Sequence, residues 1–534
     1  MKTLVIIPAA GLATRMQPLS ATMSKAMIPV CGKPILARIL KKLEKISCDI
    51  VIVGGDIPDI KNYVESRYHQ NVFYTTQDKK FDGPLGAIYS GISYYKTNNM
   101  KADNVVVWLG DTLINSEEAI NNFFNKPLEQ NIHLGVAEVS DWSRWCMIDE
   151  NGFMYDKQIE QPPTNKTLIG LYRFDNNTDA FYNTCWTLVG NNQTEIAPLI
   201  ELFKNTLNYN VMLQHFTSSW HDCGDLTSLH KTESELMKEK ARGFNSIKIE
   251  NGVVTKKSTN YSAEINWYNT IIDNNLSTRK LLPQIYSDNP ENQEYEMEYC
   301  SGSTLQDLVV YHNINRKDVW ENIINSVLSS YSTGFIEYYW TEHDTINQSI
   351  VLNDVVMFCD NIINRINQID FIDEKEKQDL KNEITSWYEY HKSVIECYDA
   401  HSIIHGDFHF GNILYDASLN KTKVLDPRGK WGYIETAAGN ILYDVAKWYQ
   451  SILCGYCHIA SDENIYETQE KLYKTLEEIS DKKWSEALID SELIIAKQFA
   501  KYLLLSAIPC HSDNPDRQKR MYSIAKRLIN EQRQ

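Results

Sequence analysis

Short apolar runs alternate with amphipathic segments along the first half of the chain. Residues 35–45 place apolar side chains three and four positions apart, which predicts a helix with one buried face. Strands that alternate with helices form a mostly parallel sheet with helices on both faces. The pattern therefore predicts an α/β domain as far as about residue 235. Its strand-like runs lie at residues 4–7, 50–53, 72–74 and 105–109.

The pattern changes after a charged run at residues 233–243, which we expect to end the first domain with a helix and a glycine stop. Two strand-like runs then flank Glu250, Asn251 and Gly252, which is a strong hairpin signal. A helix is expected from Ser262, a further strand near 295–299, and mainly helices from 305, apart from a loop-rich stretch at 401–434. The predicted domains are residues 1–240 and 246–534. The second is expected to have a small β-rich lobe (about 246–304) and a large helical lobe (about 305–534).

Composition narrows the function classes. The 534 residues are 43% hydrophobic and carry a net charge of −17. An acidic chain lacks the positive surface that nucleic acids and anionic lipids attract. The eleven cysteines form no CxxC pair, as expected of reduced thiols in the cytosol. No run approaches the ~20 apolar residues of a membrane span. We therefore expect a cytoplasmic, soluble protein without a nucleic-acid or membrane partner.

A small-residue turn follows the first predicted strand, where residues 8–15 read PAAGLATR. Such a turn lets backbone N–H groups, here at Ala10 and Gly11, approach phosphates closely. Arg15 and Lys25 follow, as the charge of a nucleoside triphosphate requires. A glycine turn by itself is also compatible with an ordinary tight connection.

The continuation, SKAMIPVCGKPIL at residues 24–36, resembles the signature of the sugar-phosphate nucleotidyltransferases, GxGTR, then PK, then GKP. Gln77 and the GPLGA stretch from Gly83 resemble the family's base-recognition segment. Asp111 in WLGD and Asp222 in WHDCGD resemble its two metal-binding aspartates, and residues 170–172 its acceptor-lining strand. The resemblance implies a three-layer, Rossmann-like α/β fold.

The chemistry that this resemblance implies needs no general base. A phosphate oxygen of the acceptor attacks the α-phosphorus of the NTP and expels pyrophosphate, so positioning and charge stabilisation carry the reaction. Asp111 and Asp222 would hold Mg²⁺ between the nucleophile and the α-phosphate. Lys25 and Arg15 would stabilise the departing pyrophosphate.

Three positions depart from the family pattern. Ala13 stands where a glycine is usual, Ser24 replaces the usual proline, and Gln161 replaces the lysine of a Glu-Lys-Pro motif. The last change removes a cation that often contacts the acceptor, so the acceptor stays open. All three departures leave open that this domain is a degenerate binding or regulatory module.

A second motif occupies residues 404–414, which read IHGDFHFGNIL and resemble the HGDxHxxN loop of the aminoglycoside phosphotransferase and choline kinase group. In phosphoryl transfer one aspartate orients the hydroxyl, while an asparagine and a second aspartate hold Mg²⁺. Asp407, Asn412 and Asp426 have these identities in this order. Asp444 lies in a later family motif, where we expect a structural role. The resemblance implies a two-lobed α+β fold like that of protein kinases.

The small lobe should supply a lysine for the ATP phosphates and a glutamate that holds it. Lys256 is the candidate lysine, because it shares a strand face with Val254 whereas Lys257 points the opposite way. Glu264, in the next helix, is its expected partner. Met297 and Glu298 lie where the group has its hinge, whose backbone would meet adenine.

Other residues near the second motif have several interpretations. We expect His405 and His409 to orient the loop and not to bind metal. Arg428 would either meet a substrate anion or brace the loop. Trp431 and Tyr433 would be able to box a cationic alcohol through cation–π contacts, although aromatic residues are more often core.

The two motifs together predict a bifunctional enzyme with Mg²⁺ as its cofactor. The kinase would phosphorylate a small alcohol with ATP, and the nucleotidyltransferase would join the product to the NMP of a second NTP. By resemblance the nearest pairing is a choline kinase with a CTP-using transferase, and such activated donors feed capsule and surface-polysaccharide synthesis. The alternatives are a sugar kinase with a sugar-1-phosphate uridylyltransferase, and an active kinase with a regulatory nucleotide-binding domain.

Overall fold

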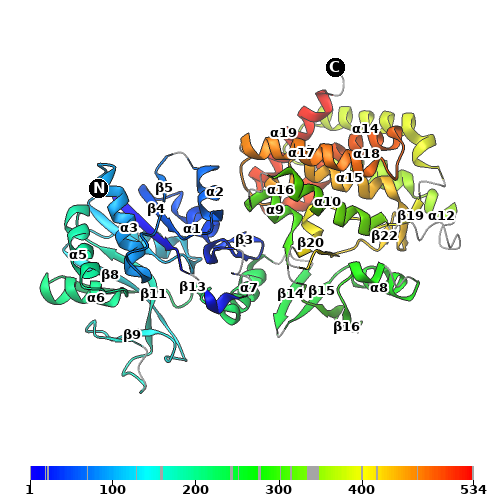
Figure 1. Cartoon of the computed structure of the whole chain (residues 1–534). Coiled ribbons are helices and arrows are strands. Elements are labelled where there is room, and N and C mark those ends of the chain that lie inside the picture. The colour runs from blue at the N-terminus through cyan, green and yellow to red at the C-terminus, as the bar shows by residue number, and fades with distance from the viewer. Residues whose placement is uncertain are drawn as a thin grey trace. The chain divides into compact units, whose positions relative to one another are not determined.

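The computed structural model describes residues 2–531 with internal gaps, and it divides the chain into two compact units, residues 1–236 and 237–534 (Figure 1). The division falls within α7 (Leu226–Lys240), a few residues before the predicted boundary. The glycine stop predicted at Gly243 lies outside the described residues. The gaps are residues 12, 18–19, 21–22, 69, 128, 157–159, 241–244, 251, 275–277, 301, 313–315, 333–347, 398–400, 417–418 and 466.

A mixed sheet forms the centre of the first unit. The strands β5 (Val72–Thr76), β4 (Cys48–Gly54), β1 (Thr3–Ala9) and β6 (Asn104–Trp108) lie side by side and run parallel. β11 (Lys166–Phe174) continues the sheet antiparallel to β6. The strand-like runs at 4–7, 50–53 and 72–74 fall within β1, β4 and β5, and the run at 105–109 matches β6 except for its last residue, so these predictions are confirmed. All seven residues of β4 are buried, as expected of a strand covered on both faces.

The remaining strands and helices of the first unit surround this sheet. Helix α1 begins at Ile35, as predicted. β8 pairs with both β11 and β12, β9 joins β10 to β11, and β7 pairs with β13. The strands are β2 (Pro29–Val30), β3 (Lys33–Pro34), β7 (Thr112–Ile114), β8 (Asn131–Glu138), β9 (Cys146–Ile148), β10 (Met154–Asp156), β12 (Asn210–His215) and β13 (Trp220–Asp222). The helices before α7 are α1 (Ile35–Leu43), α2 (Asp59–Glu65), α3 (Gly83–Thr97), α4 (Glu117–Phe124), α5 (Thr178–Gly190) and α6 (Ala197–Glu201).

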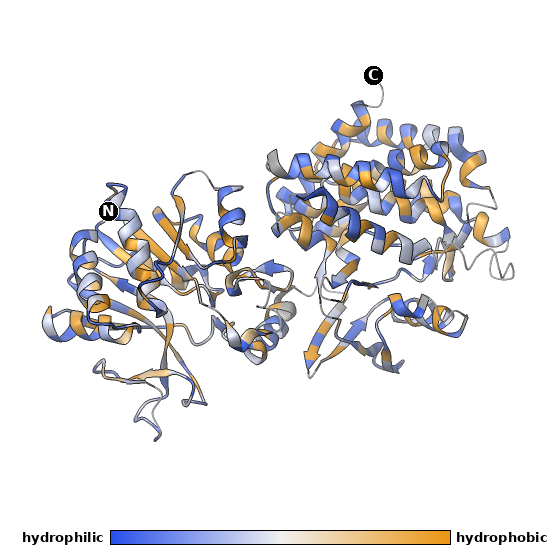
Figure 2. Cartoon of the chain, in the orientation of Figure 1, coloured by the Kyte–Doolittle hydropathy of each residue, from blue (hydrophilic) through white to orange (hydrophobic). Residues whose placement is uncertain are grey.

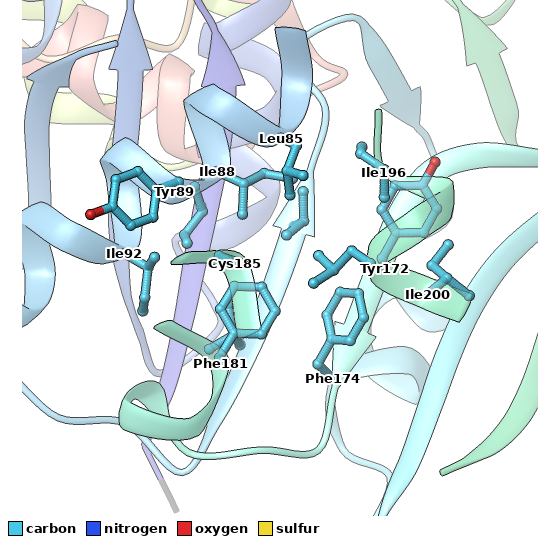
Figure 3. Packing of buried hydrophobic residues seen from close by; sticks show 14 of the residues in the cluster. Leu85, Ile88, Tyr89, Ile92, Tyr172, Phe174, Phe181, Cys185, Ile196 and Ile200 are labelled. Atoms are coloured by element: carbon cyan, nitrogen blue, oxygen red, sulfur yellow. The ribbon is translucent and has the colours of Figure 1, made fainter. Parts of the chain in front are cut away.

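The core of the first unit lies where α3 and α5 pack on the sheet. Figure 3 shows Leu85, Ile88 and Ile92 of α3 facing the rings of Phe174 and Phe181. All five side chains are fully buried. This packing fixes the N-terminal end of α3, which begins at Gly83 with proline in its first turn.

The second unit begins with a small antiparallel sheet in the order β14 (Asn245–Glu250), β15 (Val253–Ser258), β17 (Glu294–Glu298) and β16 (Ile285–Asn289). Ile249 pairs with Val254, which confirms the predicted hairpin. Helix α8 (Tyr261–Asn274) follows β15, close to the predicted start at Ser262. The predicted order of a β-rich part before a helical part is therefore present.

The helical part is built of amphipathic helices; Figure 2 shows hydrophobic and hydrophilic residues alternating around them. α15 packs closely along α18, and short strands occupy the predicted loop-rich stretch. The helices are α9 (Leu305–Tyr311), α10 (Lys317–Tyr331), α12 (Gln348–Val351), α13 (Asn361–Asn367), α14 (Glu374–Ile395), α15 (Ile441–Leu453), α16 (Tyr456–Ala460), α17 (Glu467–Trp484), α18 (Asp490–Ala507) and α19 (Pro515–Glu531). The strands are β18 (Ser303–Thr304), β19 (His401–Ile403), β20 (Ile413–Asp416), β21 (Lys421–Val424), β22 (Lys430–Trp431), β23 (Ile434–Glu435) and β24 (Ala438–Asn440).

One described segment, Asp490–His511, is long and apolar enough to cross a membrane by length and composition alone. It is not an uninterrupted apolar run, because it contains Asp490, Glu492, Lys497 and Lys501. More than half of its most apolar window is buried inside the unit. Its apolar residues are therefore accounted for by packing against α15 and α13.

Candidate functional site

Lys25 and Asp111 form the closest ion pair among the predicted site residues of the first unit. Lys25 begins a short 3-10 turn before β2, and Asp111 lies in the loop between β6 and β7. The Lys25 Nζ donates to the Asp111 Oδ2 at 2.6 Å, and both side chains stay partly exposed. A cation and a carboxylate from distant segments therefore meet at the carboxyl end of the parallel strands.

Ser24 anchors the Lys25 turn. Its backbone N–H donates to the Asp59 Oδ2 at 2.7 Å, and its hydroxyl donates to the Asp59 Oδ1 at 2.6 Å. Proline, the usual family residue here, has no N–H and would be able to make neither bond. The departure at Ser24 thus comes with a local compensation, which ties the turn to the first residue of α2.

Asp222 is held beside Asp111 by backbone pairing. Asp222 lies at the end of β13 opposite Thr112 of β7, and the N–H of Cys223 donates to the Asp111 carbonyl at 3.1 Å. The Gly224 N–H donates to the Asp222 Oδ1 at 3.0 Å, while the Asp222 Oδ2 is buried without a hydrogen-bond partner. Burial raises the pKa of Asp222, and the charge of Asp111 raises it further.

This arrangement fits a magnesium ion. Two neighbouring carboxylates, one with a buried oxygen that lacks a hydrogen-bond partner, favour a cation beside them. Within the described residues no group of three or more His, Cys, Asp or Glu side chains could hold a metal. Mg²⁺ is commonly bound by one or two carboxylates together with substrate phosphates, so a pair of aspartates is sufficient.

The predicted phosphate-binding turn directly follows β1. Gly11 and Arg15 are exposed, and a Cβ built at Gly11 would meet nothing within 4 Å. Ala13, which replaces the usual glycine, has φ 50° and ψ 40°, the left-handed conformation that glycine adopts most easily. The alanine at this position therefore holds a backbone conformation in which glycine carries no side-chain strain.

Gln77 supports a loop, and part of its side chain is already engaged. Its Nε2 donates to the Phe81 carbonyl at 2.7 Å and to the Gly83 carbonyl at 3.2 Å. Gly83 has a positive φ of 71°, and a Cβ there would lie 2.6 Å from the Thr194 carbonyl oxygen. Both residues therefore shape the loop before α3. Their predicted contact with a nucleotide base stays a prediction.

Arg144 is a residue of this site that the sequence interpretation missed. It forms an ion pair with Asp225, and its Nη2 lies 4.0 Å from the Asp222 Oδ2. Its guanidinium also lies over the Trp145 ring. Gln161, which replaces the family lysine, is exposed. Arg144 lies in a stretch without an obvious motif, and only the tertiary fold brings it to the aspartates.

In the second unit, Lys256 joins two acidic residues. Its Nζ lies 2.7 Å from the Glu264 Oε2 and 2.9 Å from the Asp426 Oδ1, and the lysine is buried. Lys257 is exposed on the opposite face of β15. The predicted pairing of Lys256 with Glu264 is present in the structure, and the tyrosine hydroxyl of Tyr295 also donates to Glu264 at 2.7 Å.

Met297 and Glu298 lie on β17, opposite Val254 and Val253 of β15. Met297 is buried, and the Glu298 N–H already donates to the Gln284 carbonyl at 2.8 Å. That N–H is therefore not available for an adenine base in this structure.

Asp407 lies at the centre of a dense polar cluster. The Lys447 Nζ lies 2.9 Å from its Oδ1, and the Asn412 Nδ2 donates to its Oδ2 at 3.2 Å. Burial alone would raise the pKa of Asp407, but the Lys447 and His409 charges hold it well below its usual value. Asp426, whose φ is 56°, follows β21 and faces Lys256. Asn412, which contacts Asp407, and Asp426 thus offer the oxygen ligands that Mg²⁺ prefers.

Asp444 has a structural role. Its carboxylate accepts from the N–H of His405 at 2.6 Å, from the N–H of Gly406 at 2.8 Å and from the Tyr331 hydroxyl at 2.7 Å. Burial raises its pKa to about 6. These bonds hold the backbone immediately before Asp407. His405 assists, since its Nδ1 accepts from the Asp407 N–H at 3.3 Å.

The aromatic box considered for Trp431 and Tyr433 is not formed. Trp431 is fully buried and donates to the Asp354 Oδ1 at 3.0 Å, whereas Tyr433 is 83% exposed. The two rings therefore do not face a common ligand. Trp431 is a core residue, which the sequence alone does not reveal because both residues follow the same motif.

Comparisons with known proteins support the nucleotidyltransferase resemblance of the first unit. Residues 5–141 match the model of the MobA-like NTP transferase domain. The bifunctional protein GlmU of Campylobacter hominis is 28% identical over 163 residues, which is 30% of this chain and 35% of that protein. A putative mannose-1-phosphate guanyltransferase of Sulfolobus acidocaldarius is 28% identical over 183 residues, 32% of this chain and 47% of that protein.

A bifunctional sugar-1-phosphate nucleotidylyltransferase/acetyltransferase of Sulfurisphaera tokodaii is 26% identical over 223 residues, covering 41% of this chain and 51% of that protein. The chain thus spans between about a third and a half of the length of these curated relatives. Among solved structures, a UDP-glucose pyrophosphorylase with UDP-glucose aligns at 20% identity and a TM-score of 0.37, covering 45% of this chain and all of that one. The N-terminal part is therefore similar in sequence to sugar-phosphate nucleotidyltransferases.

Proposed function

We propose that this chain is a bifunctional enzyme. Its second unit phosphorylates a small alcohol with ATP. Its first unit then transfers the NMP group of another NTP onto that phosphate. The products are ADP, pyrophosphate and an NDP-activated alcohol, the kind of donor used in surface-polysaccharide synthesis. CTP is the first candidate nucleotide, from the resemblance of the motifs to a choline kinase joined to a CTP-using transferase.

The observation that carries the nucleotidyl-transfer half is the meeting of Lys25, Asp111 and Asp222. The acceptor phosphate is already anionic, so no side chain has to remove a proton. Asp111 and Asp222 would hold Mg²⁺, which when bound offsets negative charge on the phosphates. Lys25 has a flexible stem and would turn from Asp111 toward a phosphate oxygen of the NTP. Arg15, exposed beside the turn, would stabilise the departing pyrophosphate.

The kinase half is supported by a separate set of contacts. Lys256, fixed by Glu264, would bind the ATP phosphates, and Asn412 and Asp426 would hold Mg²⁺. Asp407 would accept a hydrogen bond from the hydroxyl of the alcohol and orient its oxygen toward the γ-phosphorus. Because Lys447 keeps the pKa of Asp407 low, the aspartate stays ionised at neutral pH.

A second candidate for the acceptor is a sugar, giving a sugar 1-phosphate and then an NDP-sugar. Two of the matched relatives carry a sugar-1-phosphate activity in their names, which favours this candidate for the first unit.

Mass spectrometry of one reaction tests the proposal. The mixture contains the full chain, Mg²⁺, ATP, CTP, UTP, dTTP and GTP, and a panel of amino alcohols, polyols, hydroxy acids and sugars; a second mixture also contains their phosphates. A new NDP-alcohol identifies base and acceptor together. A phospho-alcohol without an NDP product would contradict the nucleotidyl-transfer half. An NDP product formed only from an added phospho-alcohol would contradict the kinase half.

A further inference from the structure

Two cationic side chains lie next to Asp407, and the proposed function uses neither of them as a ligand for ATP. Lys447 and Tyr443 are four residues apart on α15, so their side chains lie on the same face of that helix. Lys447 contacts the Asp407 carboxylate at 2.9 Å, and the Tyr443 hydroxyl accepts from the Arg428 Nη1 at 2.7 Å. The face of α15 thus places both cations near Asp407.

The backbone fixes Arg428 in the same place. Its N–H donates to the His405 carbonyl at 2.9 Å, two residues before Asp407. A Cβ at Gly406 would lie 2.6 Å from the Arg428 Cβ, so the arginine packs directly on the loop that carries Asp407. Its guanidinium also lies over the Tyr443 ring at 5.3 Å.

Among the residues that the structure describes, Arg428 forms no ion pair, although Asp407 lies close enough for its charge to act on the guanidinium. Its recorded side-chain partners are the Tyr443 hydroxyl and the Met357 sulfur. A half-buried guanidinium with neutral partners keeps unsatisfied donors, and its fork matches carboxylate and phosphate oxygens.

The two ends of the site differ in charge. Around Lys256, the carboxylates of Glu264 and Asp426 leave one negative charge in excess, which suits Mg²⁺. Around Asp407, the two cations Lys447 and Arg428 balance the two carboxylates of Asp407 and Asp444. Asp407 is the group that meets the acceptor in the proposed reaction, so the acceptor end has no negative excess to attract a cationic alcohol. The Trp431 ring, which would be able to bind a quaternary ammonium, is fully buried.

We infer that the alcohol phosphorylated by the second unit carries an oxyanion, either a carboxylate or a phosphate, which Arg428 binds while Lys447 holds Asp407 in place. This inference rests on the proposed kinase activity and names its substrate class. It predicts that an anionic alcohol is a better acceptor than choline and similar cationic alcohols.

The test is acceptor-dependent ADP release by the full chain with ATP and Mg²⁺, using two matched sets of alcohols. One set is glycerol, glycerate, glycerol 3-phosphate and choline; the other is mannose and mannose 6-phosphate. The inference predicts that an anionic member exceeds its neutral parent and choline in kcat/KM by about tenfold or more. Glycerate against glycerol 3-phosphate distinguishes a carboxylate from a phosphate. A preference for choline, or equal rates with neutral and anionic members, overturns it.

Substitution of Arg428 supplies the second readout. Arg428→Gln should raise KM for the anionic acceptor about tenfold and change KM for ATP less than about twofold. Arg520→Gln, another half-buried arginine, whose Nη1 donates to the Glu463 carbonyl at 2.7 Å, is the control and should change neither constant. An unchanged acceptor KM in Arg428→Gln overturns the role of Arg428. Absence of ADP release with every alcohol overturns the proposed kinase activity itself, and the acceptor class falls with it.

Discussion

The Lys25 Nζ lies 2.6 Å from the Asp111 Oδ2, although 86 positions separate the two residues. The turn that carries Lys25 is tied to α2, and the loop that carries Asp111 is tied to β13. The pair therefore joins the phosphate-binding segment to the candidate metal ligands. In the proposed reaction both residues bind the complex of NTP and Mg²⁺. Lys25 contacts its negatively charged phosphates, and Asp111 contacts the Mg²⁺ ion.

Replacing Ser24 by proline restores the residue of the family pattern but removes both hydrogen bonds to Asp59. Ser24 has φ −62°, which proline adopts without strain, so any loss reports the missing bonds. Hydrogen bonds to charged groups contribute about 1.5–3 kcal/mol each. Ser24→Pro should therefore unfold at lower denaturant concentration than Ser24→Ala, which keeps the N–H, and should release pyrophosphate more slowly. Equal stability of the two variants would contradict the anchoring role.

Ala13 adopts a left-handed conformation that costs an L-residue about 1–2 kcal/mol. Glycine lacks this strain but has a more flexible unfolded chain, which offsets part of the gain. Ala13→Gly is therefore expected to raise the free energy of unfolding by up to about 1 kcal/mol. Chemical denaturation measures it. Gly83→Ala is the opposite control, because its φ is 71° and its Cβ would contact the Thr194 carbonyl; it should lower stability. A lower free energy of unfolding for Ala13→Gly would contradict the prediction that backbone strain at Ala13 destabilises the fold.

Lys256 and Lys257 provide a matched pair for the kinase half. Lys256→Met should lower ADP formation by about 100-fold or more, because the ATP phosphates lose their cation, while Lys257→Met should leave it within about twofold. Lys256→Arg keeps the charge and separates loss of function from loss of folding. The assay measures ADP release with the alcohol of the acceptor panel that gives the highest rate. Full activity of Lys256→Met would exclude this lysine from ATP binding.

Glu233 of α7 gives a pH-dependent prediction. It is buried, its Oε2 has no hydrogen-bond partner, and burial raises its pKa from 4.5 to about 7. Glu233 binds its proton more tightly in the folded state, so its contribution to stability is complete below about pH 4.5 and is lost as the pH rises through about 7. The melting temperature of Glu233→Gln should therefore fall less between pH 5 and pH 8 than that of the unmodified protein. The exposed Glu65→Gln is the control, and parallel pH profiles for Glu233→Gln and the unmodified protein would refute the prediction.

The sequence predicted the strands of the first unit and the buried lysine of the second, because each depends on a pattern of neighbouring residues along the chain. The parallel strands are continuous apolar runs, and the choice of Lys256 over Lys257 needs only the alternation of side chains along a strand. Glu264 followed because it lies one helical turn into the next element.

The site contacts that the sequence did not predict join residues that are far apart along the chain. Ser24 looked like a loss of the family proline, because its partner Asp59 lies 35 residues away. Lys447 and Arg144 reach their aspartates only in the folded chain. Trp431 and Tyr433 are two residues apart and have opposite exposure, which composition does not distinguish.

The central claim is that one chain makes a phospho-alcohol and then joins it to an NMP group. Mass spectrometry of one pot with the unmodified protein, Asp111→Asn and Asp407→Asn tests it most directly. We predict an NDP-alcohol from the unmodified protein, a phospho-alcohol alone from Asp111→Asn, and neither product from Asp407→Asn until the phospho-alcohol is added. An NDP-alcohol made by Asp111→Asn at the unmodified rate, or its complete absence with the unmodified protein, would contradict the account.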